Sequence, residues 1–424
     1  MNRHRALEAL SLSVCQPWKS WFNNSSLRYS AAPVNRKPFP VLPDTLDVNV
    51  PEIQSATRTA HKHIAKLAEL KELVRLGGGE KAQASYVRKK VLPRDRITRI
   101  LDDPDEDLLE IGIFAGLGMP YGDVPSAGTI CCIGKVHGRY CMISATEGTF
   151  KGGTMFPITV TKQISVLDKA EKCGLPFVFF IDSGGAFLPL QSLLFPDKMG
   201  GGRVFYLESV LGSQGLPTVA VICGSCTAGG AYGPALCQEA GITDKTGTVF
   251  LGGPPLVKAA LGYDIGAQEL GGAELHSRVS GVTDYFLGTE DEGFDVVRDV
   301  IATTNYSSSD CTAATTWEEP LHDASHLDSL CGLQSLSKDQ VVAVISRVAD
   351  GSRFREFKAM YGSHLITGYA AVHGQIVGVV ANFGSLTYAD GLKGAHFLQI
   401  CQQRHLPVLF LQNNATDIAS HRYG

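Results

Sequence analysis

Short apolar runs alternate with longer amphipathic segments through the middle of the chain, between residues 128 and 305. The run 177–181 contains only aromatic and β-branched residues, with no polar alternation. Such a run is typical of a strand covered on both faces of a parallel sheet, and we expect this strand to span 175–181. The other expected elements are helices at 156–172 and 203–212, a strand at 218–222, and a hairpin of strands 130–136 and 140–144. Strands and helices in this order predict an α/β fold.

Glycine-rich segments follow two of the predicted strands. The first is Asp182–Ala186, with Gly184 and Gly185 at its centre, and the second is Gly224–Tyr232. Ligands of parallel sheets bind beyond the carboxyl ends of the strands, and glycine lets backbone N–H groups approach a ligand oxygen closely. The alternative is that each segment is only a tight turn. Two such segments, one leading into a helix, are suited to a thioester oxygen that becomes negative as an enolate forms.

Several common enzyme motifs are missing from the sequence. It has no GxxxxGK[ST] phosphate loop, no intact GxGxxG, no HExxH and no GxSxG. Ser183 and Ser225 are candidate nucleophiles, but no general base can be assigned to them, so a hydrolase is the weaker hypothesis. The 11 cysteines show no zinc-ligand spacing, and no metal is expected. Cys223 and Cys226, after the strand 218–222, are expected to be buried thiols, with a redox pair as the alternative.

Two segments precede the α/β region. Apolar residues at helical spacing predict a long amphipathic helix at 52–76, closed by Gly77–Gly79. The following segment, 88–101, is rich in Arg and Lys. It is either a solvated helix face or a site for an anionic ligand such as a nucleotide phosphate, and the sequence leaves both open.

The chain partly repeats itself after a Ser/Thr/Asp-rich stretch at 307–334, which we interpret as a linker. Val372–Gly374 repeats the turn sequence of Val136–Gly138, and 406–413 resembles 175–182. Because the two pairs keep their order and nearly the same separation, we interpret them as a duplicated domain. The counterpart of the second glycine-rich segment would fall beyond the last residue. We therefore expect the second domain to be incomplete, in a fragment or a shortened isoform.

Charge and hydropathy restrict the partners. The net charge of −4 gives no reason to expect nucleic acid or an anionic membrane, and no apolar run is long enough to span a bilayer. Residues 1–40 are basic, serine-rich and poor in acids, as in a mitochondrial transit peptide. A disordered basic tail is the alternative. We therefore expect a mitochondrial matrix protein with no nucleic-acid partner and no membrane partner.

A set of motifs extends along most of the chain. Its members are Lys151–Thr154, Asp182–Ala186, Gly224–Tyr232, Gly252–Ala260, Leu270–His276, Ser280–Asp284 and Asp350–Lys358. Together they resemble the carboxyltransferase (β) subunits of biotin-dependent acyl-CoA carboxylases, and among these most closely the methylcrotonyl-CoA carboxylases. The resemblance covers about residue 45 to the end.

The resemblance implies an α/β fold of duplicated crotonase-like domains, the second incomplete. Residues 41–306 would form the acyl-CoA domain, and residues 335–424 would form part of the biotin domain. The implied reaction moves CO2 from carboxybiotin to an acyl-CoA such as 3-methylcrotonyl-CoA, in leucine degradation. The biotin ureido nitrogen takes the substrate proton, so the resemblance implies no protein base.

The resemblance also implies partners. The active site would form where the first domain of one subunit meets the second domain of another, in a homo-oligomer that is a hexamer in the family. Biotin would be carried by a partner α subunit, which would also use the ATP, because this chain has neither a biotinylation motif nor an ATP-binding signature.

Particular residues receive roles from the same resemblance. Gly184 and Gly185, together with Gly229 and Gly230, would stabilise the thioester oxygen. The residues implied to line the coenzyme A side are Lys151, Gly152, Gly153, Ser183, Ala186, Thr227, Ala228 and Tyr232, and those implied to face biotin are Gly384, Asn413, Ala415 and Thr416.

Two positions depart from the family pattern. Phe187 stands where the family has Asn, and the segment 413–417 lacks the glycine that the family places there. The alternative function is therefore a paralogue or shortened isoform that binds acyl-CoA, or assembles with carboxylase subunits, without turnover.

Overall fold

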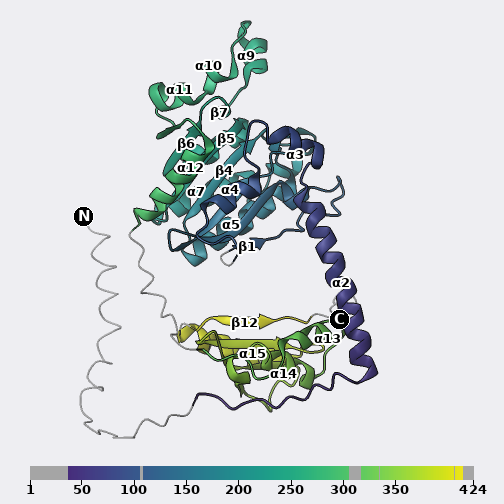
Figure 1. The fold of residues 1–424 in the computed structure, drawn as a ribbon. Helices are drawn as coiled ribbons and strands as arrows, with labels where there is room; N and C mark the ends of the chain where they lie inside the picture. Colours follow the sequence, from purple (N-terminus) through teal and green to yellow (C-terminus); the bar gives the residue numbers. More distant parts are fainter. Residues whose placement is uncertain (1–36, 106–107, 305–316, 334, 405, 414–424) are drawn as a thin grey trace, which may run out of the picture. The chain divides into compact units, whose positions relative to one another are not determined.

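The computed structural model describes residues 37–413 except 106–107, 305–316, 334 and 405 (Figure 1). The predicted transit peptide therefore lies outside the described residues, apart from 37–40. The described residues divide into two compact units, each with its own sheet. The first unit contains 47–304 and 328–333, and the second contains 37–46, 317–327 and the described part of 335–413.

The first unit is built on an eight-stranded sheet in the order β1-β2-β3-β4-β5-β6-β8, with β7 paired to β5. The pairs β1–β2 and β2–β3 are antiparallel, and every later pair is parallel. The strands are β1 (Leu108–Ile111), β2 (Thr129–Val136), β3 (Arg139–Thr146), β4 (Phe177–Ser183), β5 (Thr218–Thr227), β6 (Glu239–Thr243), β7 (Thr248–Phe250) and β8 (Tyr285–Leu287).

The central strand β4 is buried along its whole length. Phe177, Phe179 and Ile181 belong to a core shared with α5 (Pro157–Cys173) and α7 (Gly201–Ser213). Val178 and Phe180 belong to a second core, shared with α4 (Pro93–Ile100) and α12 (Glu290–Ala302). Successive side chains of a strand point to opposite faces, so the two cores lie on opposite faces of the sheet. The prediction of a strand covered on both faces is confirmed.

The predicted helices and β4 agree with the structure to within two residues. The strand predicted at 218–222 is longer, because β5 continues to Thr227 by pairing Ser225 with Thr248 of β7. Cys223 and Cys226 therefore lie inside a strand and do not follow one, which corrects the sequence interpretation. The remaining helices of this unit are α2 (Pro51–Arg75), α3 (Glu80–Tyr86), α6 (Gln191–Leu194), α8 (Tyr232–Leu236), α9 (Pro254–Leu261), α10 (Ala267–Gly271), α11 (Ala273–Leu275) and most of α13 (Leu327–Cys331).

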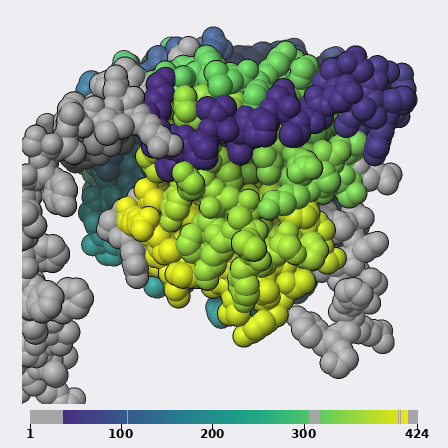
Figure 2. Space-filling view, turned by 90° about the horizontal axis from the view of Figure 1, so that it is seen from below, coloured from purple at the N-terminus to yellow at the C-terminus, as the bar shows by residue number. Residues whose placement is uncertain are grey.

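The second unit has a four-stranded sheet in the order β12-β11-β10-β9. Its helices α14 (Lys338–Ser346) and α15 (Tyr388–Gln403) contribute to two separate apolar clusters. Residues 37–46 belong to this unit and pack on its other residues (Figure 2), where the Leu42 N–H donates to the Ser352 carbonyl at 2.8 Å. The strands are β9 (Phe354–Phe357), β10 (Leu365–Val372), β11 (Gln375–Asn382) and β12 (Val408–Leu411).

The hairpin turn is repeated in the two units. His137–Gly138 and His373–Gly374 have the same φ angles, 47° and 77°. The Asp102 carboxylate accepts from both N–H groups of the first turn, at 3.0 and 2.7 Å. Asp350 does the same in the second turn, at 2.9 and 2.6 Å. The repeated sequence thus corresponds to a repeated structure, with a matching carboxylate that the sequence comparison did not reveal.

Candidate active site

The glycine-containing turn Lys151–Gly153 and the glycine-rich segment Asp182–Ala186 lie side by side. The Gly184 N–H donates to the Gly152 carbonyl at 2.9 Å, and the Met155 N–H donates to the Gly185 carbonyl at 2.8 Å. A Cβ on Gly153 would stand 1.9 Å from the Asp182 carbonyl oxygen, so this contact requires glycine. The turn Lys151–Gly153 is thereby attached to the carboxyl end of β4.

The other predicted glycine-rich segment, Gly224–Tyr232, joins them from β5. A Cβ on Gly230 would stand 3.4 Å from the Ser183 hydroxyl, and a Cβ on Gly185 would stand 3.1 Å from the Thr227 carbonyl. Thr227 precedes a short 3₁₀ helix, Ala228–Ala231, that leads into α8. N–H groups at the first positions of a helix have no acceptor within it, which leaves the Gly229 N–H available to a ligand.

The availability of backbone donors differs between the predicted residues. The Gly184 N–H already has a backbone acceptor, and the Gly185 N–H donates to the Ser183 hydroxyl at 3.2 Å. In this structure the start of the 3₁₀ helix, at Ala228 and Gly229, is therefore the better-placed donor site. The role of all these glycines in holding an oxyanion stays a prediction.

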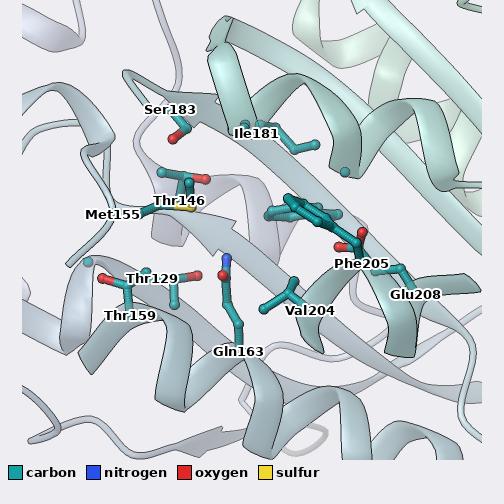
Figure 3. Close-up of a pocket in the computed structure, with 15 residues that line it drawn as sticks. Thr129, Thr146, Met155, Thr159, Gln163, Ile181, Ser183, Val204, Phe205 and Glu208 are labelled. Carbon is teal, nitrogen blue, oxygen red and sulfur yellow. The ribbon is translucent and has the colours of Figure 1, made fainter. Parts of the chain in front are cut away.

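A cavity lies beneath these segments, with a volume of about 30 Å³. Figure 3 shows Gln163 of α5 directed toward its centre, with Thr129 and Thr159 to one side and Val204 and Glu208 of α7 to the other. The complete lining is Gly128, Thr129, Thr146, Met155, Thr159, Gln163, Phe179, Ile181, Ser183, Val204, Phe205, Glu208, Gly229, Gly230 and Gly233. Ser183, Gly229 and Gly230 link the cavity to the predicted site.

Phe187, the first departure from the family pattern, does not line the cavity. Its ring stacks on Phe156 with centroids 4.6 Å apart. The Lys151 ammonium lies 5.1 Å from the centroid of Phe187, 5.5 Å from that of Phe156 and 5.8 Å from that of Phe150. These distances are within the range of cation–π attraction, so Phe187 helps to position Lys151 at the turn.

Asp182 has a role that sequence reasoning missed. One of its carboxylate oxygens accepts from the Tyr86 hydroxyl at 2.6 Å and from the Lys90 ammonium at 2.7 Å, and the other accepts from the Ser225 N–H at 3.1 Å. Burial, followed by the charge of Asp182, raises the pKa of Tyr86 despite the opposing effect of Arg96. Asp182 therefore connects the ends of β4 and β5 to the end of α3 and the segment after it, and it does not line the cavity. No local sequence signal marks Tyr86 as its partner.

The basic segment 88–101 is exposed at Arg88, Lys89 and Arg99, as a solvated face would be, while its other cations pair with acids of the first unit; a role in binding an anion stays a prediction. Arg94 pairs with Glu110 at 2.6 Å, and Arg96, which has no exposed surface, pairs with Glu290 at 2.7 Å. Together with the ion pair between Lys90 and Asp182, these contacts attach α4 and the residues just before it to the rest of the first unit. Buried cations need such partners to offset the loss of hydration.

Cys223 and Cys226 are fully buried and free. Burial raises the pKa of both thiols, and a raised pKa disfavours the thiolate needed for redox chemistry. Within the described ranges, no group of three or more His, Cys, Asp or Glu side chains could hold a metal ion. In the same residues, no helix is long and apolar enough to cross a membrane.

In the second unit, the structure describes two of the four residues predicted to face biotin. Gly384 follows β11 with φ 67°, and a Cβ there would meet only His364, at 3.7 Å. The Asn413 N–H and carbonyl both bond the Asn382 side chain, at 2.8 Å each. Because β11 and β12 are parallel neighbours, both positions lie at the same edge of the sheet. Ala415 and Thr416 lie outside the described residues.

The first unit, with glycine-rich segments at the carboxyl ends of its parallel strands and a cavity beneath them, has the crotonase-like α/β fold. Its solved neighbours show the same fold. The β subunit of geranyl-CoA carboxylase from P. aeruginosa is similar, with a TM-score of 0.77 and 29% identity over 88% of this chain and 71% of that one. The transcarboxylase 12S hexamer is similar with a TM-score of 0.53 and 28% identity, over 82% of this chain and 69% of that one.

The sequence comparisons identify the family. Residues 84–416 match the model of the carboxyl transferase domain. The mitochondrial methylcrotonoyl-CoA carboxylase beta chain of Arabidopsis thaliana is 43% identical over 380 residues, which is 88% of this chain and 65% of that protein. A biotin-dependent 3-methylcrotonyl-coenzyme A carboxylase beta1 subunit of Mycobacterium tuberculosis is 44% identical over 89% of this chain and 72% of that protein. The chain belongs to the carboxyl transferase family, and it spans about two thirds of the length of these relatives.

Proposed function

We propose that this chain is a carboxyltransferase subunit of a mitochondrial biotin-dependent acyl-CoA carboxylase that acts on a short, branched acyl-CoA such as 3-methylcrotonyl-CoA. One observation carries the proposal: three glycine-rich segments meet at the ends of β4 and β5, above a cavity that Gly229 and Gly230 line. Relatives named methylcrotonoyl-CoA carboxylase beta chains support the choice of substrate.

The first unit would bind the acyl-CoA. The thioester carbonyl would lie at the start of the 3₁₀ helix, where the Gly229 N–H can donate to its oxygen. Negative charge develops on that oxygen as the enolate forms, and preorganised N–H donors stabilise this charge more than they stabilise the neutral thioester. Lys151, held above Phe156 and Phe187, would provide positive charge for the phosphates of coenzyme A.

The second unit would contribute to a biotin site. Gly384 and Asn413 fit this role, because they place open backbone and a fixed amide at one edge of the sheet. Biotin would be carried by a partner α subunit that also uses the ATP. In its carboxylated form it would supply the CO2, and its ureido nitrogen, freed by loss of CO2, would take the substrate proton. The chain's own part is to orient the thioester and to stabilise the charge on its oxygen. We further propose a homo-oligomer of this subunit, as in the hexameric 12S relative, and a location in the mitochondrial matrix.

The test is carboxylation of 3-methylcrotonyl-CoA with labelled bicarbonate by the full chain and a biotin-loaded α subunit. A methyl group at Gly229 would meet no atom within 4 Å, so Gly229→Ala should fold normally. It should nevertheless lower kcat/KM about 10- to 100-fold by obstructing the thioester oxygen.

Gly202→Ala in α7 is the matched control, because its added methyl also meets nothing within 4 Å. Acyl-CoA binding without turnover by the unmodified chain would overturn the proposed carboxyl transfer and support the binding-only alternative. Equal activity of Gly229→Ala and Gly202→Ala would show that Gly229 does not contact the thioester oxygen.

A further inference from the structure

A bulge interrupts the pairing of β4 with β5 just before the proposed donor site. The pairs that flank it are Ile181 with Ile222 and Ser183 with Cys226. Asp182 of β4 therefore corresponds to residues 223–225 of β5. On the other side of β5, the neighbouring strand changes from β6 to β7 over the same stretch. Bulges redirect a strand locally and are common next to active sites, so the path of β5 toward Gly229 depends on how this bulge is held.

The carboxylate of Asp182 occupies the bulge. Its Oδ1 atom accepts from the Ser225 N–H at 3.1 Å, and the side chain is 7% exposed. A Cβ on Gly224 would stand 2.0 Å from this oxygen and 2.5 Å from the Lys90 Nζ atom. Only glycine fits at position 224 while the carboxylate is in place. The bulge and the carboxylate are therefore packed as one feature.

Tyr86 and Lys90 fix the second oxygen of the same carboxylate. The Oδ2 atom accepts from the Tyr86 hydroxyl at 2.6 Å and from the Lys90 ammonium at 2.7 Å. The Lys90 charge also offsets the loss of hydration of the buried carboxylate. Because Oδ2 is held by two donors, Oδ1 cannot turn away from the Ser225 N–H without breaking both of these bonds.

Ser225 connects the bulge to the start of the 3₁₀ helix. Its hydroxyl lies 2.9 Å from the Thr227 hydroxyl, and Thr227 is the residue before this helix. The next residue, Ala228, has φ 53°, which a residue with a Cβ keeps only where its surroundings hold it. Gly229 follows directly. A displaced bulge would therefore change the direction of the Gly229 N–H.

We infer that Asp182, Tyr86 and Lys90 are positioning residues for the proposed carboxyl transfer. They hold the Gly229 N–H in the orientation in which it stabilises the negative thioester oxygen. This inference rests on the proposed function and on the role of Gly229 in it. A displacement of about 1 Å can cost about 100-fold in rate. The negative oxygen depends on the donor more than the neutral thioester does, so the loss should appear in kcat and not in KM.

The experiment measures kcat and KM for 3-methylcrotonyl-CoA, with the full chain and a biotin-loaded α subunit. Asp182→Asn keeps the size of the side chain, but its amide nitrogen is a donor. It cannot accept from the Ser225 N–H and from the two donors on the other side at once. We expect kcat to fall about 10- to 100-fold, with KM unchanged within about 3-fold. Tyr86→Phe removes one bond and should lower kcat about 3- to 10-fold.

Double variants test whether the other two residues act through the carboxylate. Lys90→Met alone leaves the buried carboxylate without its cation, and it should lower kcat about 10-fold or more. Residues that act as a unit are not additive. Adding Lys90→Met or Tyr86→Phe to Asp182→Asn should therefore change kcat by no more than about 2-fold. Losses that multiply would overturn the assignment of the added residue to this unit.

Asp102→Asn is the matched control. Asp102 also accepts from two backbone N–H groups and pairs with an arginine, but at a turn that contains no residue of the proposed site. Its kcat should equal that of the unmodified chain. The inference is overturned if Asp182→Asn keeps the kcat of the unmodified chain, or loses activity only through KM. If Asp182→Asn does not fold, an unchanged kcat in Tyr86→Phe overturns it equally. No turnover by the unmodified chain would instead show that the proposed carboxyl transfer is wrong, and this inference with it.

Discussion

The two units share a scaffold but differ in the loop where a ligand would bind. Both contain the antiparallel hairpin with its carboxylate-bound turn, a helix and a following parallel strand. Both also bury a lysine in that helix, Lys162 in α5 and Lys393 in α15. Each donates to two backbone carbonyls near the start of the hairpin, at 2.9 and 2.8 Å for Lys162 and at 3.3 and 2.6 Å for Lys393.

The loop between the hairpin and the helix distinguishes the units. Ten residues connect β3 to α5, and five connect β11 to α15. The longer loop contains Lys151–Gly153, the turn that packs against the end of β4. Duplication thus preserved the contacts that hold the scaffold, while Lys151–Gly153, proposed to face coenzyme A, lies in an extension specific to the first unit.

The largest effect is expected at this extension. Gly153→Ala should destabilise the first unit by about 4 kcal/mol or more, because its Cβ would overlap the Asp182 carbonyl and the loop would have to separate from β4. Gly152→Ala is the control, since Gly152 also has a positive φ but no atom within 4 Å of its Cβ position. It should cost only about 1–2 kcal/mol. Chemical denaturation of the two variants measures the difference, and equal losses would show that strain and not overlap governs the turn.

Glu208 provides the second effect, again in the first unit. Burial raises its pKa to about 8, above the ordinary 4.5, so between these values the folded state keeps a proton that the unfolded state has lost. The contribution of Glu208 to stability should therefore fall as pH rises from about 4.5 to 8. The side chain of Glu208→Gln does not titrate. The free energy of unfolding of this variant, relative to the unmodified chain, should therefore rise by on the order of 3 kcal/mol across that window. Tm values at pH 5 and pH 8 test this, and a pH-independent difference would contradict it.

The two buried lysines test whether the shared scaffold is stabilised in the same way in both units. Lys162→Met and Lys393→Met should each cost about 2 kcal/mol, because each leaves two buried carbonyls without a donor. We expect the losses to be similar, and hydrogen exchange of the two hairpins measures them separately. A large loss in one unit alone would show that the two lysines no longer have equivalent roles.

The smallest effect is expected at the hairpin turns. Asp102→Ala and Asp350→Ala each remove two backbone hydrogen bonds, for a loss of about 1–2 kcal/mol. Asp102→Ala should cost slightly more, because Asp102 also pairs with Arg298 at 2.9 Å. Exchange rates of the Gly138 and Gly374 amides report on the two turns. If the Gly374 amide in Asp350→Ala exchanges faster than the Gly138 amide in Asp102→Ala, the expectation that Asp102→Ala costs more is wrong.

Local pattern predicted much of the scaffold. The apolar run of β4 and the spacing of the main helices were enough to place them, because burial on both faces and helical periodicity leave direct traces in sequence. The duplication was also visible, since Val372–Gly374 repeats Val136–Gly138. The extension of β5 was missed, because it depends on pairing with β7, a strand of only three residues.

Long-range polar contacts were not predictable in the same way. Tyr86 and Asp182 are 96 residues apart, and nothing in either segment marks the pairing. The ion pairs of segment 88–101 were unpredictable for the same reason, since Glu290 lies 194 residues after Arg96. Glu208 did leave a signal: Val204, Leu207 and Leu211 surround it at helical spacing, which places a carboxyl on the apolar face of α7.

The repeated hairpin also has a consequence for folding kinetics. Hairpins form within about 1–10 μs, so β3 and β11 each present an unpaired edge before a parallel strand arrives. The wrong pairings, β4 on β11 and β12 on β3, compete with the right ones, as is common in chains with internal repeats. About 30 residues separate β3 from β4, but about 190 separate β4 from β11. The difference in loop-closure entropy favours the correct partner by about 1.5 kcal/mol, so the short crossover through α5 directs β4 to its own hairpin.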